Sequence, residues 1–479
     1  MSSENKGKWW PLVAVCLGNF MLLIDVTIVV TALPRMAEDL DAGLTDLQWV
    51  MDAYALALAA LLMAAGAAGD ILGRRRVYVL GLAGFAVSSL ACALAPDART
   101  LIAARAVQGL AAAAMFATNA PLLAAAYQGR DRGVAFGVWG AVSGAASALG
   151  VLLGGVLTQY LEWPAIFLVN LPFSALTIAL TWRWIAESRG DGGARVDWPG
   201  TVAFTLTAGA LTYGLIRGGE ESWTDGVTLA SFVVAALALA AFVVVERRSA
   251  HPLLDLRLMR QPSFAALMVA GMVLTASAFA HYAFTMLWLQ DVQHLSPVRA
   301  GLAVVPMAAA AFVVAGVGGR LLQRVPPWAA VSGGLLLIGA GALAQTAISA
   351  DSSWTVLVPG LVLTGVGVGI AIPVLVSAAL AAAPPERAGM ASGAVNTFRQ
   401  LGFALGVAVL GTLFADRVAT AAGPPAAAFA AGLDRVYLVA GLAAVCAALL
   451  VAAVAMASRP AGRRSAAAAP PRRTRVPAG

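Results

Sequence analysis

The chain has 479 residues, of which 60% are hydrophobic and 11% are charged, and its mean hydropathy is +0.84. Soluble domains carry roughly 25% charged residues, so this composition excludes a soluble protein of two or three domains. The net charge of +7 does not indicate a nucleic-acid partner, because the arginines fall in short connections between apolar blocks.

The apolar residues form fourteen blocks, most of them about twenty residues long, which is enough for a helix to cross a ~30 Å hydrocarbon core. A helix satisfies its own backbone hydrogen bonds in lipid, and the alternating pattern of barrel strands is absent. The sequence therefore predicts an all-α polytopic membrane protein with fourteen transmembrane helices. The blocks lie at 9–31, 47–69, 77–95, 101–127, 134–158, 164–184, 199–217, 227–245, 262–289, 300–321, 328–349, 354–380, 388–414 and 433–457.

The first block is predicted to be a retained helix rather than a signal peptide. It follows Lys6 and Lys8, but its apolar run is too long for a signal peptide, contains Asp25 and lacks a small-residue cleavage site.

Basic residues are distributed unequally between the two sets of connections. If the N-terminus is cytoplasmic, the cytoplasmic segments hold 23 Lys and Arg residues and the outer loops hold six. By the positive-inside rule, both termini are predicted to be cytoplasmic. The tail at 458–479 is rich in Ala, Pro and Arg and is predicted to be disordered.

Few ionisable residues lie inside the blocks, where they are costly and usually functional. Asp25 is sixteen residues beyond Trp9, or roughly 24 Å from the cytoplasmic edge. Asp52 and Arg105 each lie about five residues, or roughly 7 Å, from the outer edge. All three are therefore expected at similar depth, in the outer half of the membrane.

Two carboxyl groups beside one arginine form a candidate proton site, because burial raises the pKa of a carboxylic acid and a guanidinium lowers it. Asp25, Asp52 and Arg105 are accordingly predicted to couple proton movement to transport. Two alternatives stay open: Asp52 caps the second helix at the interface, or Asp25 makes a hydrogen bond that packs helices. Arg105 is expected to be a structural or coupling partner rather than a substrate ligand.

The second half of the chain has no carboxylate well inside a helix, so proton coupling is expected in the first half. Asn396, Arg399 and Gln400 in the thirteenth block either contact substrate or bridge helices. The three cysteines and three histidines are isolated in sequence, so neither a disulfide framework nor a metal site is expected.

The connection between the second and third blocks contains spaced glycines, an aspartate and clustered arginines. The pattern is carried by Gly66, Asp70, Gly73, Arg74 and Arg75. It resembles the loop signature of the major facilitator superfamily, although that family usually has a basic residue directly after the aspartate. The resemblance implies that these residues form a charge clamp that locks one conformation.

Further segments resemble the fourteen-helix drug:proton antiporters of that superfamily. They are residues 24–34 in the first block, 49–54 in the second and 101–109 in the fourth, which contains Arg105. A set of glycines in the fifth block resembles the antiporter motif of this family, with Val151 in place of its usual proline. The glycines are Gly140, Gly144, Gly150, Gly154 and Gly155.

The resemblance implies two six-helix bundles, at 9–184 and 262–457, that rock about a central cavity. Residues 185–261 would hold two inserted helices, and residues 1–8 would form a cytoplasmic N-terminus. The implied function is proton-coupled efflux of small lipophilic, or cationic, drugs or antibiotics across the cell membrane.

The implied protein is a monomer in the lipid bilayer that needs no cofactor, because the proton gradient drives it. The alternative is proton-coupled uptake of a nutrient or metabolite. An enzyme is not expected, because no nucleophile set or metal cluster is visible in the sequence.

Overall fold

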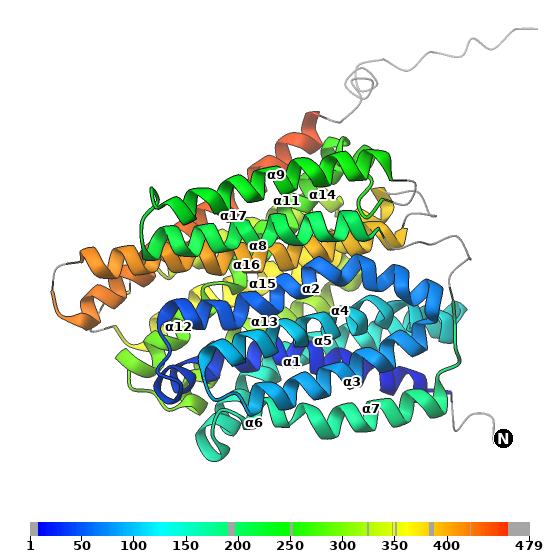
Figure 1. Ribbon diagram of the computed structural model, residues 1–479, viewed down its shortest axis with the longest axis horizontal. Helices are drawn as coiled ribbons and strands as arrows, with labels where there is room; N and C mark the ends of the chain where they lie inside the picture. The colour runs from blue at the N-terminus through cyan, green and yellow to red at the C-terminus, as the bar shows by residue number, and fades with distance from the viewer. Residues whose placement is uncertain are drawn as a thin grey trace, which may run out of the picture.

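The computed structural model describes residues 8–189, 197–249, 252–322, 325–346, 348–349, 352–382, 388–421 and 423–457. Every regular element in these ranges is helical (Figure 1). Residues 1–7 of the predicted cytoplasmic N-terminus at 1–8 lie outside the described residues, and so does the predicted disordered tail at 458–479.

The first part of the chain forms a set of long helices joined by short connections. A glycine at Gly73, with φ of +112°, separates the second helix from the third. The elements are α1 (Trp10–Asp39), α2 (Leu44–Leu72), α3 (Arg74–Ala93), α4 (Ala98–Ala126), α5 (Gly129–Leu161), α6 (Ala165–Leu168) and α7 (Asn170–Trp184).

A helical hairpin and a short helix follow. α8 (Trp198–Glu220) and α9 (Gly226–Arg248) lie side by side (Figure 1). Each begins with an aspartate that caps its free N–H groups: the Asp197 carboxylate accepts from Gly200 N, and that of Asp225 accepts from Val227 and Thr228 N. α10 (Leu256–Met259) leads into the last part of the chain.

The last part again consists of long helices, one of which is interrupted. The ninth apolar block is divided at residues 280–281 between α11 (Pro262–Phe279) and α12 (Tyr282–Leu287), and ends in a π-helical turn, η2 (Trp288–Val292). The others are α13 (Pro297–Leu322), α14 (Pro327–Ala344), the 3-10 turn η3 (Trp354–Val356), α15 (Leu357–Ala382), α16 (Ala388–Thr420) and α17 (Pro425–Ala457).

All fourteen predicted blocks are mainly helical. Among the described residues, twelve helical segments are long and apolar enough to cross a membrane. The blocks without such a segment are α5 and α8, which are 33 and 23 residues long. The multi-pass helical architecture is thus confirmed, and the count of fourteen spans stays a prediction at these two helices.

Two hydrophobic cores hold the helices together. One is built around Tyr78 and Phe85 and is formed only by residues between Leu12 and Ile185. The other continues from α1 and α2 into α11–α17 and so joins the two parts of the chain. The two parts approach closely at α5 and α13, where a Cβ on Gly155 would lie 2.6 Å from the Pro297 carbonyl oxygen.

The α8–α9 hairpin packs against both parts of the chain through α8. The Tyr213 ring lies 6.1 Å from the Trp49 ring of α2. On α16, the Thr412 hydroxyl donates to the Leu215 carbonyl of α8 at 3.1 Å. α8 therefore contacts both α2 and α16, which also contact each other, and Figure 1 shows the three helices running next to one another.

Candidate functional site

A buried ion pair joins α1 to α4. Arg105 Nη1 lies 2.6 Å from Asp25 Oδ2, and the two side chains are 2% and 0% exposed. A buried pair of this kind persists only when further hydrogen bonds satisfy both groups. The predicted coupling residues Asp25 and Arg105 are therefore in direct contact.

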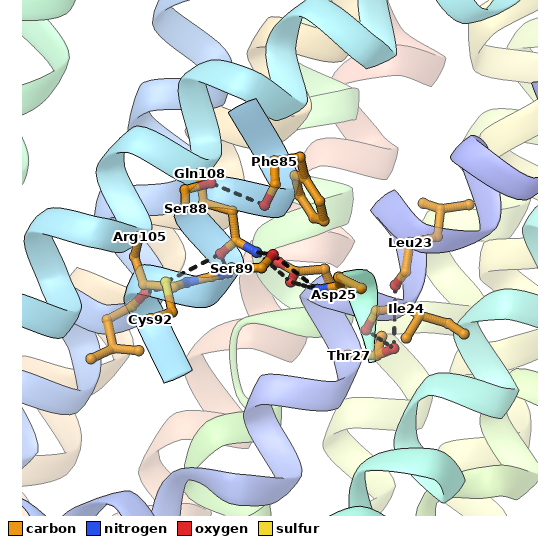
Figure 2. A network of polar contacts seen from close by, with 12 residues as sticks. Leu23, Ile24, Asp25, Thr27, Phe85, Ser88, Ser89, Cys92, Arg105 and Gln108 are labelled. Carbon is orange, nitrogen blue, oxygen red and sulfur yellow. Dashed lines mark hydrogen bonds and ion pairs between the residues drawn. The ribbon is translucent and has the colours of Figure 1, made fainter. Parts of the chain in front are cut away.

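Uncharged side chains complete the network around this pair. Gln108 donates from Nε2 to Asp25 Oδ1 at 2.9 Å, and Asn170 donates to the same oxygen at 3.3 Å. The hydroxyl of Ser89 accepts from both Gln108 Nε2 and Asn170 Nδ2. Figure 2 shows Asp25, Ser89, Arg105 and Gln108 converging from α1, α3 and α4. The carboxyl group of Asp25 therefore accepts hydrogen bonds from three side chains, those of Arg105, Gln108 and Asn170.

The arginine is also held by α2 and by an aromatic pair. Arg105 Nε donates to the Val50 carbonyl at 3.2 Å. Its guanidinium lies 4.2 Å from the centre of the Tyr54 ring and 5.8 Å from that of Phe167. A desolvated cation over an aromatic face is stabilised by the ring quadrupole. These contacts fix Arg105 at the junction of four helical segments.

A small cavity lies against Arg105, between the two parts of the chain. Its volume is about 10 Å³, and it is lined by Val26, Val29, Met51, Tyr54, Arg105 and Phe403. That is about the volume that admits the centre of one water molecule. Phe403 belongs to α16 and the other lining residues to α1, α2 and α4, so the cavity connects the ion pair to the interface between the two parts.

Asp52 is buried but lies outside this network. It is 0% exposed, and neither carboxyl oxygen has a hydrogen-bond partner among the residues that the structure describes. Val50 and Tyr54 contact Arg105. Asp52, midway between them, points to the opposite side of the helix because successive residues are about 100° apart around its axis. The structure therefore brings one carboxylate, not two, to Arg105.

The position of Asp52 also bears on the alternative that it caps the second helix. α2 begins at Leu44, and the Asp46 carboxylate accepts from Gly43 N at 3.1 Å. Asp52 lies two turns further into the helix, so it does not cap α2. Gln48 lies one turn before Asp52, on the same side of α2, and packs against α16: a Cβ on Gly411 would overlap its side chain.

The residues of the predicted clamp lie where α2, α3 and the segment after α7 meet, and the locking role stays a prediction. Arg74 pairs with Asp70 at 2.8 Å, and Arg75 N donates to Glu187 Oε1 at 2.9 Å. At Gly73 a Cβ would lie 2.6 Å from the Glu187 carboxyl carbon, in addition to the strain of a positive φ. Gly66 has more room, since the nearest atom to its Cβ position is 3.9 Å away, in Ala117.

Glu187 is a site residue that the sequence analysis missed. Its carboxylate faces Arg75 and Arg76 at 3.9 and 3.7 Å. The sequence did contain a signal for Glu187: it is an acidic residue shortly after a predicted helix, in a connection expected on the same side of the membrane as the arginine cluster. Ser89 and Asn170 were missed as well, because a search for ionisable residues does not find uncharged hydrogen-bonding groups.

The antiporter-motif glycines of α5 face two helices. Gly150 and Gly154 pack on α1, where a Cβ on Gly150 would overlap Thr27 and one on Gly154 would lie 2.8 Å from the Ile28 carbonyl. Gly155 packs on α13 instead. α5 is one continuous helix through Val151. Gly140 and Gly144 lie in α5, but their surroundings are outside what the structure describes.

The predicted cavity residues of α16 lie near one another and are half-buried. Arg399 Nη1 donates to Asn396 Oδ1 at 3.3 Å, and its Cγ lies 3.3 Å from the Cβ position of Gly271 in α11. Arg399 therefore packs inside the second part of the chain. Thr397 is the residue that reaches α2, where its hydroxyl donates to the Ala59 carbonyl at 3.5 Å.

One histidine described as isolated in sequence has polar neighbours in space. His281 Nδ1 lies 3.4 Å from the Thr285 hydroxyl, which lies 2.8 Å from the Tyr437 hydroxyl. In the described ranges, no group of three or more His, Cys, Asp or Glu residues is placed to hold a metal, and all three cysteines are free.

The helical architecture is that of a polytopic membrane protein, with a buried ion pair between two of its helices. The sequence model of the Major Facilitator Superfamily matches residues 15–407. The chain therefore belongs to this superfamily and is a transporter rather than an enzyme.

Similar proteins have names that refer to resistance. The chain is 36% identical over 412 residues to multidrug resistance protein Stp of Mycobacterium tuberculosis, covering 86% of this chain and 76% of that protein. It is 34% identical over 436 residues to a methylenomycin A resistance protein of Streptomyces coelicolor, covering 90% and 91%.

A third relative is described as an exporter. The tetracenomycin C resistance and export protein of Streptomyces glaucescens is 33% identical over 419 residues, with coverage of 87% and 78%. Among solved structures, a peptide transporter bound to sulfate matches with a TM-score of 0.68 at 16% identity, covering 93% of this chain and 94% of that one. This last likeness supports the fold alone.

Proposed function

We propose that this protein exports small lipophilic drugs or antibiotics across the cell membrane in exchange for protons. The observation that carries the proposal is the buried Asp25–Arg105 network in a chain related to resistance proteins over most of its length. The proposed transporter is a monomer with both termini in the cytoplasm.

Asp25 is the proposed proton carrier. Arg105, Gln108 and Asn170 all donate to its carboxylate, so the conformation described here suits the deprotonated form. Protonation removes the negative charge opposite Arg105 and turns one acceptor oxygen into a donor. Because α1 and α4 meet at this pair, the change of one charge alters which conformation is favoured.

The proposed cycle uses this difference to drive export. Substrate binds from the cytoplasm or the inner leaflet while Asp25 is deprotonated. After the two bundles rock, a proton from outside reaches Asp25 and favours substrate release. Coupling requires only that proton and substrate bind the two conformations with different affinity.

Asp52 is the proposed contact for substrates that carry a positive charge. Its carboxylate oxygens are buried and lack partners in the described part of the chain, whereas the carboxylate of Asp25 is already paired. A cationic group next to Asp52 would compensate its buried charge. A neutral antibiotic would not depend on this residue, so the two carboxylates have separable roles.

The test is ethidium efflux from a pump-deficient bacterial host that expresses the wild type, Asp25→Asn, Asp52→Asn or the control Asp46→Asn. We expect wild-type efflux to stop when a protonophore is added, and Asp25→Asn to abolish it. Puromycin and a neutral antibiotic should be tried in parallel. Wild-type efflux that persists with the protonophore would overturn proton coupling, and accumulation in place of efflux would favour nutrient uptake.

A further inference from the structure

Two carboxyl groups meet at one end of the α8–α9 hairpin, on the side predicted to be cytoplasmic. Asp197 directly precedes α8, and Glu246 lies in the last turn of α9. They are 8% and 4% exposed. Neither residue belongs to the network of Asp25, and none of the recognised motifs includes them.

The two side chains converge on the first turn of α8. A Cβ on Gly200 would lie 2.7 Å from Glu246 Oε1 and 3.0 Å from Asp197 Cγ. The backbone N–H of Gly200 donates to Asp197 Oδ1 at 2.8 Å, and that of Leu254 donates to Glu246 Oε2 at 3.0 Å. Each carboxyl group thus has one oxygen bonded to backbone.

The remaining oxygens, Asp197 Oδ2 and Glu246 Oε1, are buried and have no hydrogen-bond partner within the described ranges. In the described part of the chain neither group forms an ion pair. The arginines nearest in sequence, Arg247, Arg248 and Arg257, are exposed. Asp255, which directly precedes α10, is buried and accepts from Arg257 N at 2.8 Å. Arg195 and His251 lie outside the described residues.

Placing two charged carboxylates in such a site is unfavourable in free energy. A buried carboxylate without a partner loses its hydration, and a second one beside it adds repulsion. One bound proton removes both costs, because the protonated group becomes a donor to the other carboxylate.

We propose that Asp197 and Glu246 form a proton-binding site, separate from the transport site, that holds one proton between the two carboxyl groups. The bound proton joins α8, α9 and the segment at 252–255 that leads into the second part of the chain. Releasing it leaves two negative charges together and loosens this end of the hairpin. The site therefore makes the packing of the hairpin depend on cytoplasmic pH.

The direction of the pH dependence follows from linkage. The folded protein binds one more proton than the unfolded chain over the pH range in which only the folded site retains it. Its stability therefore falls as pH rises, and the unfolding equilibrium constant increases by up to about tenfold per pH unit.

The test is thermal unfolding of the full-length protein in detergent between about pH 5 and pH 9, a range above the reference values of carboxyl groups. We expect the wild-type midpoint to fall as pH rises. Glu246→Gln keeps a donor to Asp197 and cannot titrate, so its midpoint should fall less. Asp225→Asn, at the other end of the hairpin, should keep the wild-type slope, and so should His251→Gln.

Infrared spectroscopy gives a readout that does not require stable variants. The wild type should show the carbonyl stretch of a buried carboxylic acid that fades at high pH, and Asp197→Asn or Glu246→Gln should remove that band. Identical pH slopes in the wild type and Glu246→Gln, or a band unchanged by both variants, would overturn the proposal. So would stabilisation of the wild type by Mg²⁺ or Ca²⁺ at neutral pH that Glu246→Gln abolishes, since the site would then hold a metal. Export through Asp25 is measured separately and does not bear on this result.

Discussion

Asp25 of α1 and Arg105 of α4 are 80 residues apart in sequence and form a 2.6 Å ion pair that is almost completely buried. Each residue has further partners: the carboxylate accepts from Gln108 and Asn170, and the guanidinium contacts Val50 and Tyr54. Removing one member of the pair therefore has a different consequence from neutralising both.

Arg105→Ala should destabilise the protein strongly, because it leaves the carboxylate of Asp25 buried without its counter-ion. The expected loss is about 3–5 kcal/mol. The double variant Asp25→Asn/Arg105→Ala should recover part of that loss, since no charged group is then left buried at the pair. Thermal unfolding in detergent measures both. If the double variant is as unstable as the sum of the single variants, the pair is not energetically coupled.

Asp52→Asn should have little effect on stability or raise it, because an uncharged amide replaces a buried carboxyl group that has no partner among the described residues. Efflux of a cationic substrate should decrease while efflux of a neutral one is retained. The measurement is parallel efflux of the two compounds from cells with matched expression. Asp46→Asn is the control, since Asp46 also lies in α2 but only caps its first turn. Equal loss for both compounds would assign Asp52 to coupling instead.

Gly155→Ala should destabilise the contact between the two parts of the chain. The new Cβ would lie 2.6 Å from the Pro297 carbonyl oxygen, so α5 and α13 must move apart. Overpacking of this kind costs about 1–3 kcal/mol. Gly209→Ala is the matched control, because no atom lies within 4 Å of its Cβ position in α8. Unfolding midpoints that shift equally in the two variants would show that the close approach is not important.

The fold was largely predictable because the apolar blocks alone require helices. Hydropathy did not predict the interruption at residues 280–281, since the residues on both sides remain mostly apolar. It also did not reveal that α8 would contact α2 and α16 at once, because that contact depends on tertiary packing around Tyr213 and Leu215.

The candidate site was predictable in depth but not in orientation. Counting residues placed Asp25, Asp52 and Arg105 at similar levels, and the structure pairs Asp25 with Arg105. The direction in which Asp52 points is set by which face of α2 packs on α4. The sequence of α2 alone does not determine that face. Glu187 was not identified because an acid is common in a connection that is predicted to be cytoplasmic.

Asp225→Asn should change the acid side of the stability profile, in the opposite direction to the Asp197–Glu246 site. The hydrogen bond from Arg217 Nε, at 3.1 Å, lowers the pKa of Asp225, and the backbone N–H groups of Thr228 and Val227 lower it further. A carboxyl group with a lowered pKa stabilises the fold above its unfolded value of about 3.9, and this contribution is lost as pH falls. The variant should therefore have a smaller decrease in unfolding midpoint between about pH 5 and pH 3 than the wild type. If its acid-side slope matches the wild type, the Arg217–Asp225 contact does not persist in the folded protein.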